Sequence, residues 1–501
     1  MRSSVAASEM LRDRLAAIVA EFELPTAFST ELEADARRAA TANPGIDLRG
    51  RTDAREIPFV TLDPATSIDL DQAFAIAADG PDLVLSYAIA DVGAVVVEGS
   101  ALEEEAWRRG ETVYLPHRRI PQYPTTLSEA AASLLPGGDR AAVVLTVAIG
   151  PEGTPTLRRA ERAIVRSCSK LAYETTAPGD VPLLAEFARR AAECDARRGA
   201  QQAEPPEQEI VDDPTSPTGI GLQFRARSAS EGANAALSLS ANMAVASLFV
   251  DLGVGLFRDL AEPDAREIAS LRRVAAGFGI VWAPDESIRA VLARLNIIDP
   301  RHAALQLAVR RAGGGARYRL YERGPDGTLA ASTRPGRSPL DNAPPSLQSG
   351  RQAAGVRAST GPWHSAMAAP YAHATAPLRR LADRYVLDLA VLLSAGGTPD
   401  AASVDRLAAL PATMERADTT AARVDRACLD LVEAILLRER VGEEFDAVVV
   451  DSNKDGAAIT IAEPAVRARL AHSDAEPGAR VRVRLTEADP ATRMVRFEPV
   501  K

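Results

Sequence analysis

Three aspartates stand within ten residues of the stretch FVTLDPATSIDLDQAF, positions 59–74. Asp63 ends an apolar run typical of a strand, and Asp69 and Asp71 alternate across one residue, so an extended segment points both to one side. Carboxylates this close repel one another unless cations lie between them. Oxygen ligands of this kind select hard ions such as Mg²⁺ or Mn²⁺. The cluster therefore suits hydrolysis of a phosphodiester assisted by two metal ions roughly 3.5–4 Å apart.

Other interpretations of this loop stay open. A sugar-nucleotide transferase also uses a D-x-D motif with a metal ion, and a solvated aspartate turn needs no ion at all. A calcium-binding loop is disfavoured, because the spacing lacks the glycine and the terminal glutamate that such loops require.

A second group of polar residues lies in YAHATAPLRRLADRY, residues 371–385. His373, Arg379 and Arg380 stand around Pro377, which can open a helix at its first position. A helix N-terminus beside arginines binds phosphate groups. The alternative is a capped helix with solvent-exposed arginines.

A third stretch, GETVYLPHRRIPQYP, sets Tyr114 and Tyr123 among arginines in a loop rich in proline. Aromatic rings interleaved with cations are what single-stranded nucleic acid stacks on. Tyrosines buried in a hydrophobic core are the alternative.

The composition is that of an ordinary soluble globular protein. The 501 residues are 46% hydrophobic and 25% charged, a length that predicts about two to four domains. The net charge of −10 argues mildly against nucleic acid, although a basic groove can lie in an acidic shell. All but three of the 58 basic residues are arginines, whose planar fork suits phosphate; a GC-rich coding bias explains the same excess.

Three scattered cysteines without metal-binding spacing fit a reducing cytoplasm. No run of about 18 uncharged apolar residues occurs. The charged N-terminus predicts an amphipathic helix, not a secretion signal. We therefore expect a cytoplasmic monomer without a membrane segment.

The apolar patterns predict an α+β protein in three parts. Residues 1–54 are charged and helical, and residues 55–440 mix strands with helices. Residues 441–501 alternate around an Asn-Lys-Asp-Gly turn, as in a small β-barrel.

Local signals place the elements of the middle part. We expect a hairpin about Asp79–Asp82, and Ser100 with Glu103 predicts a capping box. The nearly apolar stretch NAALSLSANMAVASLFVDLGVGLF predicts a buried helix. Residues 324–362 are rich in Pro, Ser and Gly, which predicts a mobile surface insertion. Helices are expected over residues 185–199, most of 233–310, 377–395 and about 412–440.

Five stretches in this order resemble the catalytic RNB domain of the ribonuclease II / ribonuclease R family. They are TLDPATSIDLDQA, YAIADVGAVVVEGSALEEEAWRRGETVYLPHRRIP, SKLAYE, PPEQEIV and YAHATAPLRRLADRY, within about residues 57–440. The resemblance implies mixed strands and helices around an RNA channel, followed by an OB-type RNA-binding barrel. It also implies processive 3′→5′ hydrolysis of single-stranded RNA to nucleoside 5′-monophosphates with Mg²⁺, or with Mn²⁺.

The resemblance implies three sets of functional residues. The metal ligands are Asp63, Asp69, Asp71 and Gln72. The catalytic residues are Asp71 and Arg379, the latter matching the arginine that contacts the phosphate undergoing cleavage. The RNA-binding residues are Tyr114, which matches a stacking aromatic, Tyr173, which matches a tyrosine at the 3′-terminal nucleotide, and His373, Arg380 and Asp425.

The chain departs from the family pattern at several positions. Gln72 replaces a fourth aspartate, Ala235 and Ala236 replace an acidic pair, and Ala376 stands where serine is usual. About 55 residues precede the domain, too few for the usual two cold-shock barrels. The alternative function is therefore an RNB-like RNA-binding protein with weakened or lost catalysis.

Overall fold

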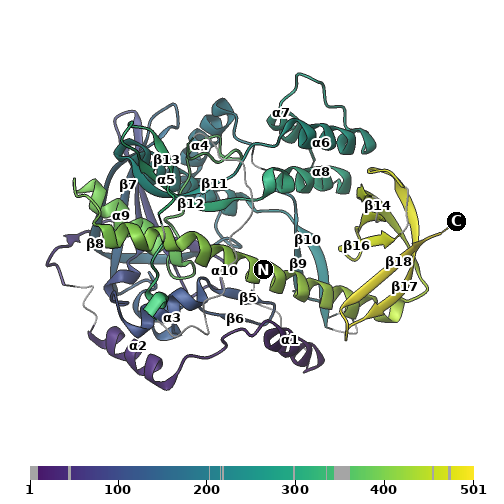
Figure 1. Cartoon of the computed structure of the whole chain (residues 1–501), viewed down its shortest axis with the longest axis horizontal. Helices are drawn as coiled ribbons and strands as arrows, with labels where there is room; N and C mark the ends of the chain where they lie inside the picture. The colour runs from purple at the N-terminus through teal and green to yellow at the C-terminus, as the bar shows by residue number, and fades with distance from the viewer. Residues whose placement is uncertain are drawn as a thin grey trace.

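The computed structural model describes residues 9–42, 47–201, 203–214, 216, 219–296, 299–334, 336–342, 361–453, 456–471 and 475–500. Two N-terminal helices, a mixed body and a C-terminal barrel follow one another along the chain (Figure 1). The predicted α+β class is confirmed.

The N-terminal helices are α1 (Glu9–Glu21) and α2 (Thr30–Ala42). Leu11, Leu15 and Ile18 recur at helical spacing on α1, and all three side chains are buried. They join a hydrophobic cluster with residues of the long helix α10 (Ala401–Leu437). Burial of this one face anchors α1 to the body.

A six-stranded mixed sheet forms the centre of the body. Its strands are β1 (Thr52–Asp53), β2 (Phe59–Asp63), β3 (Gln72–Asp79), β4 (Asp82–Ala90), β7 (Asp139–Ile149) and β8 (Pro155–Ala172). Their order is β1-β8-β2-β3-β4-β7, and β8 also pairs with β7, so the sheet closes on itself. The predicted hairpin between β3 and β4 is confirmed, with Gly80 at φ 57° in its tip.

Helices pack around this sheet. They are α3 (Ala101–Arg109), α4 (Leu184–Arg198), α5 (Ala229–Leu252), α9 (Leu381–Ser394) and α10. The predicted cap at Ser100 before α3 is confirmed, because Ser100 Oγ accepts from the Glu103 amide at 3.3 Å. The reciprocal half of a capping box is not formed, because the Glu103 carboxylate accepts from the Gly99 amide and the Ser100 amide donates to the Val97 carbonyl. Helix α5 contacts β8, α4, α9 and β11 (Val254–Asp259).

Helix α5 is the predicted apolar helix, but it ends at Leu252. Gly253 takes φ 82°, which is open to glycine, and the next residues form β11. Within the described residues α5 alone is long and apolar enough to cross a membrane, and half of that apolar window is buried in the fold. A core helix has this property as readily as a membrane span.

The remaining elements of the body form small units. They are β5 (Val113–Leu115), β6 (Arg118–Ile120), β9 (Glu207–Asp212), β10 (Ile220–Arg225), β12 (Arg317–Arg323), β13 (Leu329–Ala331), α6 (Ala265–Gly277), α7 (Ile288–Ala293) and α8 (Pro300–Arg311). Short helical turns occupy Val92–Ala94, Leu127–Ala131, Pro178–Asp180, Ala312–Gly314, Pro339–Asn342 and Arg438–Arg440.

The expectation of an unstructured insertion over residues 324–362 is wrong for its first half. Strand β13 pairs with β12, and the Arg337 amide donates to the Asp405 carbonyl of α10 at 3.0 Å. Leu340 packs against the main hydrophobic core. A short edge strand and one apolar anchor need no periodic sequence pattern, so composition missed them. Residues 343–360 lie outside the described residues.

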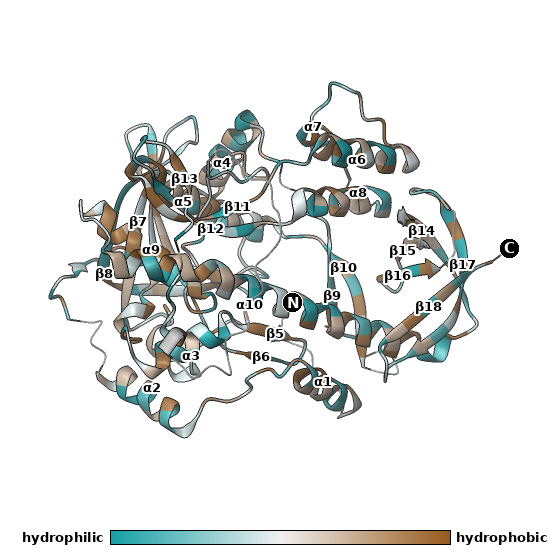
Figure 2. Ribbon diagram, viewed as in Figure 1, coloured by the Kyte–Doolittle hydropathy of each residue, from teal (hydrophilic) through white to brown (hydrophobic). Residues whose placement is uncertain are grey.

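The last part of the chain is a closed five-stranded barrel. Its strands are β14 (Glu444–Asn453), β15 (Gly456–Ile461), β16 (Val466–Ala471), β17 (Arg480–Asp489) and β18 (Met494–Pro499). Phe445, Val449 and Phe497 fill its interior, and Leu437 at the end of α10 joins them. Helix α10 runs from the body to the barrel and carries alternating hydrophilic and hydrophobic bands (Figure 2).

Candidate active site

The first wall of the site is the edge of the sheet where β2 and β8 end together. The two strands are parallel, and Asp63 pairs with Ala172 at this edge. The Tyr173 amide donates to the Asp63 carbonyl at 3.1 Å. Parallel strands end at the same edge, so Asp63 and Tyr173 are neighbours although they lie far apart in sequence.

A buried serine fixes the loop that carries the other two aspartates. Ser133 Oγ accepts from the Leu70 amide at 2.9 Å and donates to the Ile68 carbonyl at 2.7 Å. The Leu70 side chain is fully buried. With Leu70 anchored, Asp69 and Asp71 on either side of it are held at the rim of the sheet.

The second wall is the segment before α9, which two polar side chains hold in place. The Asp383 carboxylate accepts from the amides of Thr375 at 2.9 Å and Ala376 at 2.7 Å. Asn242 of α5 accepts from the Ala374 amide at 2.9 Å. The prediction that Pro377 opens the helix is wrong, because these contacts keep the segment irregular and α9 begins at Leu381.

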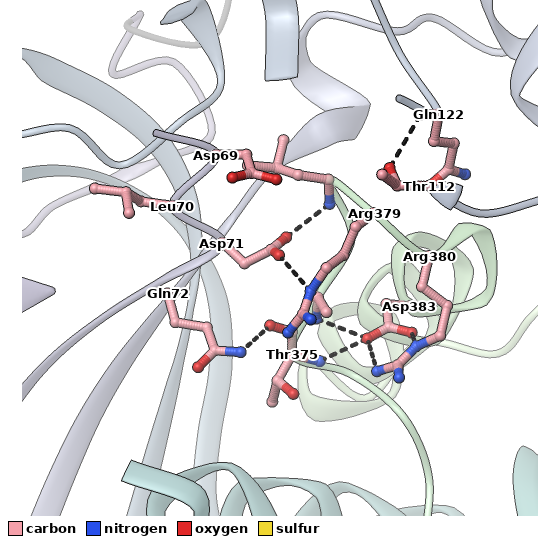
Figure 3. Close-up of polar contacts among 12 residues, drawn as sticks. Asp69, Leu70, Asp71, Gln72, Thr112, Gln122, Thr375, Arg379, Arg380 and Asp383 are labelled. Carbon is pink, nitrogen blue, oxygen red and sulfur yellow. Dashed lines mark hydrogen bonds and ion pairs between the residues drawn. The ribbon is translucent and has the colours of Figure 1, made fainter. Parts of the chain in front are cut away.

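Asp71 joins the two walls (Figure 3). Its Oδ1 accepts from the Leu378 amide at 2.7 Å and its Oδ2 from Arg379 Nε at 3.1 Å. Burial raises the pKa of Asp71 to about 7, although the Arg379 guanidinium opposes this shift. Burial likewise raises the pKa of Asp63 to about 6. Both carboxylates are short of solvation, so added positive charge would favour their ionised forms.

Asp69 forms an ion pair that the sequence did not indicate. Arg119 Nη1 lies 2.6 Å from Asp69 Oδ1, and Arg119 Nε donates to Glu129 Oε1 at 2.9 Å. The exposed fractions of the Arg119, Asp69 and Glu129 side chains are 19%, 13% and 18%. The sequence signal for this contact is the Arg-Arg pair at positions 118–119, which spacing alone assigns to the cationic loop around Tyr114.

Gln72 is hydrogen bonded through both atoms of its amide group. Its Nε2 donates to the Thr375 carbonyl at 2.5 Å, as Figure 3 shows. Its Oε1 accepts from the Tyr87 hydroxyl and from Ser238 Oγ, the latter at 3.2 Å. These bonds join β3, β4, α5 and the segment before α9, so Gln72 already has a structural role.

A cavity of about 1360 Å³ brings most of the predicted site residues together. The predicted residues that line it are Asp63, Asp69, Asp71, Gln72, Tyr114, Tyr173 and Arg379. The side chain of Arg379 is 49% exposed, and its two Nη groups make no hydrogen bond with another described residue. Tyr173 accepts from Asn234 Nδ2 at 2.7 Å, which fixes its ring at the cavity wall.

Three predicted RNA-binding residues do not line this cavity. His373 hydrogen bonds through Nδ1 to the Tyr318 hydroxyl at 2.6 Å and packs edge-on against the Tyr371 ring. Arg380 is paired with Asp383 at 2.7 Å. Asp425 lies on the part of α10 that packs against α1. Tyr123 is also buried, which favours the core alternative for that residue.

The carboxylates suit a hard divalent cation in their chemistry. Within the described ranges, however, no group of three or more His, Cys, Asp or Glu side chains is placed to hold a metal ion. Arg119 and Arg379 explain this, because they contact Asp69 and Asp71. The Asp63 carboxylate makes no hydrogen bond or ion pair with another described residue. Asp63 is therefore the carboxylate most open to an ion, and Asp71, whose two oxygens each accept a single hydrogen bond, can share it.

Comparison with known proteins identifies the body and the barrel. The RNB domain matches residues 51–392, and the RNase II-type exonuclease C-terminal S1 domain matches residues 443–500. Ribonuclease R 1 of Lactococcus lactis subsp. lactis is 25% identical over 470 residues, which are 89% of this chain and 53% of the relative. The chain thus spans about half the length of that relative.

Two further matches concern the fold and a shorter region. The structure of Mycoplasma genitalium RNase R in complex with ribose methylated single-stranded RNA superposes with a TM-score of 0.80 at 19% identity, over 98% of this chain and 78% of that one. The inactive exonuclease DIS3L2 of Arabidopsis thaliana is 38% identical over 132 residues, 26% of this chain and 12% of the relative. Metal dependence is general in this family. The match over most of the body, joined to the S1 barrel, shows that the chain belongs to the RNB domain family.

Proposed function

We propose that the chain is a metal-dependent exoribonuclease that degrades single-stranded RNA from the 3′ end. The observation that carries this proposal is the contact between Asp71 and Arg379 in a cavity that also receives Asp63 and Tyr114. This arrangement offers carboxylates for water activation, a guanidinium for phosphate and an aromatic ring for a base. The RNB family membership supports it.

Each residue of the cavity has a separate role in the proposed reaction. A divalent ion, when bound, lowers the pKa of water and neutralises charge on the phosphate. Arg379 donates from its free Nη groups to the oxygens of the phosphate undergoing cleavage. Asp71, which the Leu378 amide and Arg379 Nε hold in place, would orient the attacking water and take a proton from it. The water oxygen bonds to phosphorus as the bond from phosphorus to the 3′-oxygen of the preceding nucleotide breaks. That 3′-oxygen takes up a proton from solvent to become a hydroxyl, and the terminal nucleotide leaves as a 5′-monophosphate.

The aromatic residues hold the RNA in this proposal. Tyr114 stands on β5 beside the aspartates, and Tyr173 lies at the wall near Asp63. Stacking on such rings is worth roughly 1–3 kcal/mol per base and does not depend on sequence. We infer Mg²⁺ as the ion, with Mn²⁺ as a substitute, from the all-oxygen donor set.

A second candidate is an RNA-binding protein without catalysis. It is favoured by Gln72, which stands where the family has a fourth acid and is hydrogen bonded to the protein instead. The two functions differ in one measurable property, which is cleavage of bound RNA.

The test uses an oligo(A) RNA labelled at its 5′ end, incubated with the protein and Mg²⁺. The proposal expects a ladder that shortens from the 3′ end, release of mononucleotides, and inhibition by chelator. Asp71→Asn should bind RNA without cleaving it. Asp79→Asn is the matched control, because Asp79 lies at the exposed tip of the β3–β4 hairpin. RNA binding without cleavage by the wild type would establish the second candidate.

A further inference from the structure

Arg119 lies within the carboxylate cluster of the site. Its guanidinium contacts Asp69 on one side and Glu129 on the other, at 2.6 and 2.9 Å. All three side chains line the cavity and are mostly buried. A cation that is buried between two carboxylates is held tightly, because removing any one partner leaves an unpaired charge.

The backbone of the β5–β6 hairpin keeps the Arg119 side chain next to Asp69. Strands β5 and β6 form a hairpin in which Tyr114 pairs directly with Arg119. Residues opposite each other in an antiparallel pair project to the same face. Arg119 therefore belongs to the same face as Tyr114, the aromatic residue proposed to hold RNA, and Glu129 approaches from the helical turn Leu127–Ala131.

The charges of the site match one divalent ion. Around the aspartates the carboxylates are Asp63, Asp69, Asp71 and Glu129, and the guanidiniums that contact them are Arg119 and Arg379. The cavity wall also carries Glu204, Glu207, Glu231, Arg118, Arg225, Arg227 and Arg310, of which Arg225 pairs with Glu231 and Arg227 with Glu204. The groups around the aspartates leave two formal negative charges, and Gln72 adds none. A second divalent ion would make the site cationic in a mostly buried space, which is unfavourable without further ligands.

We propose that Arg119 is a fixed cation that pairs with Asp69 in place of a second metal ion, so that the chain binds a single divalent ion through Asp63 and Asp71. This inference rests on the proposed function, in which the site holds a divalent ion. Arg119 is a positioning residue in this scheme. It neutralises Asp69 and keeps that carboxylate out of the ion's coordination.

The experiment measures the number of Mn²⁺ ions bound per chain, without RNA, by titration followed with electron paramagnetic resonance. The wild type should bind one ion. Arg119→Met should bind a second, because it frees the Asp69 carboxylate, and Arg119→Lys should return to one. Arg118→Met is the matched control, since Arg118 is the neighbouring arginine and makes no ion pair with a described residue; it should also bind one ion.

A double variant keeps the test decisive if Arg119→Met does not fold. Asp69→Asn combined with Arg119→Met removes a neutral pair, so one ion should still bind with an affinity within about threefold of the wild type. Two ions in the wild type would overturn the inference. So would loss of the ion in the double variant, or one ion in a folded Arg119→Met protein. Because no RNA is present, these results stand apart from the cleavage assay that tests the proposed function.

Discussion

Replacing Asp71 by asparagine should stabilise the metal-free protein while abolishing cleavage. Burial raises the pKa of this carboxyl from its ordinary 3.8 to about 7. A shift of roughly three units, at about 1.4 kcal/mol each, means that the ionised carboxylate costs the fold about 4 kcal/mol above pH 7. Asparagine is never ionised and avoids this cost.

The substitution also removes one favourable contact. The side-chain oxygen of asparagine can still accept from the Leu378 amide, but the contact with Arg379 Nε is lost. The shift of about three units already includes this contact, because the Arg379 guanidinium opposes the rise in the Asp71 pKa. The net expectation for Asp71→Asn at pH 8 is therefore a gain of up to about 4 kcal/mol in the free energy of unfolding.

The stability difference between Asp71→Asn and the wild type should also depend on pH. A carboxyl with a raised pKa binds its proton more tightly in the folded state than in the unfolded state. The contribution of Asp71 to the free energy of unfolding is therefore fully present below pH 4 and is lost as the pH rises through 7. The difference in Tm between variant and wild type should therefore grow from pH 5 to pH 8.

The assay is thermal unfolding in buffers that contain a chelator. Circular dichroism should show a Tm for Asp71→Asn that lies above the wild-type value at pH 8 and close to it at pH 5. Adding Mg²⁺ should raise the wild-type Tm more than that of the variant, since the ion replaces missing solvation of the carboxylate. A variant that is less stable than the wild type at pH 8 would refute the argument that burial of this charge is uncompensated.

Three further predictions concern single side chains. Tyr114→Ala should remove roughly 1–3 kcal/mol of RNA binding and release a longer final oligonucleotide on a sequencing gel; an unchanged product would favour a purely structural tyrosine. Asp383→Ala should lower stability by about 3–5 kcal/mol in denaturant titrations, because the fully buried Asp383 carboxylate pairs with the partly buried Arg380 guanidinium and accepts from the Thr375 and Ala376 amides; a loss below about 1 kcal/mol would show that this pair is solvated. Gln72→Asp removes the donor to the Thr375 carbonyl and should cost about 1–3 kcal/mol of stability, with no change in half-saturating Mg²⁺. A lower half-saturating Mg²⁺ concentration for Gln72→Asp than for the wild type would instead show that position 72 contacts the metal ion.

Several features of this protein follow from the sequence by itself. The helix cap at Ser100 and the hairpin about Asp79–Asp82 depend on residues a few positions apart, and both are present. Alternation of apolar residues indicated the barrel, because a closed sheet buries every second side chain. The aspartate motif indicated metal-assisted chemistry as one of several interpretations, and the resemblance of five stretches to the RNB domain favoured phosphodiester hydrolysis among them.

Other features were decided only when distant parts of the chain met. Arg119 reaches Asp69 across 50 residues, and Gln72 reaches the Thr375 carbonyl across 303. Neither pairing has a local signature, because each depends on which elements the closed sheet and its helices bring together. The same reason explains why His373 and the cavity are separate, although the residue lies in the motif that supplies Arg379. Spacing in sequence determines which side chains can share an element, whereas packing determines which charges face each other and hence how many ions the site can hold.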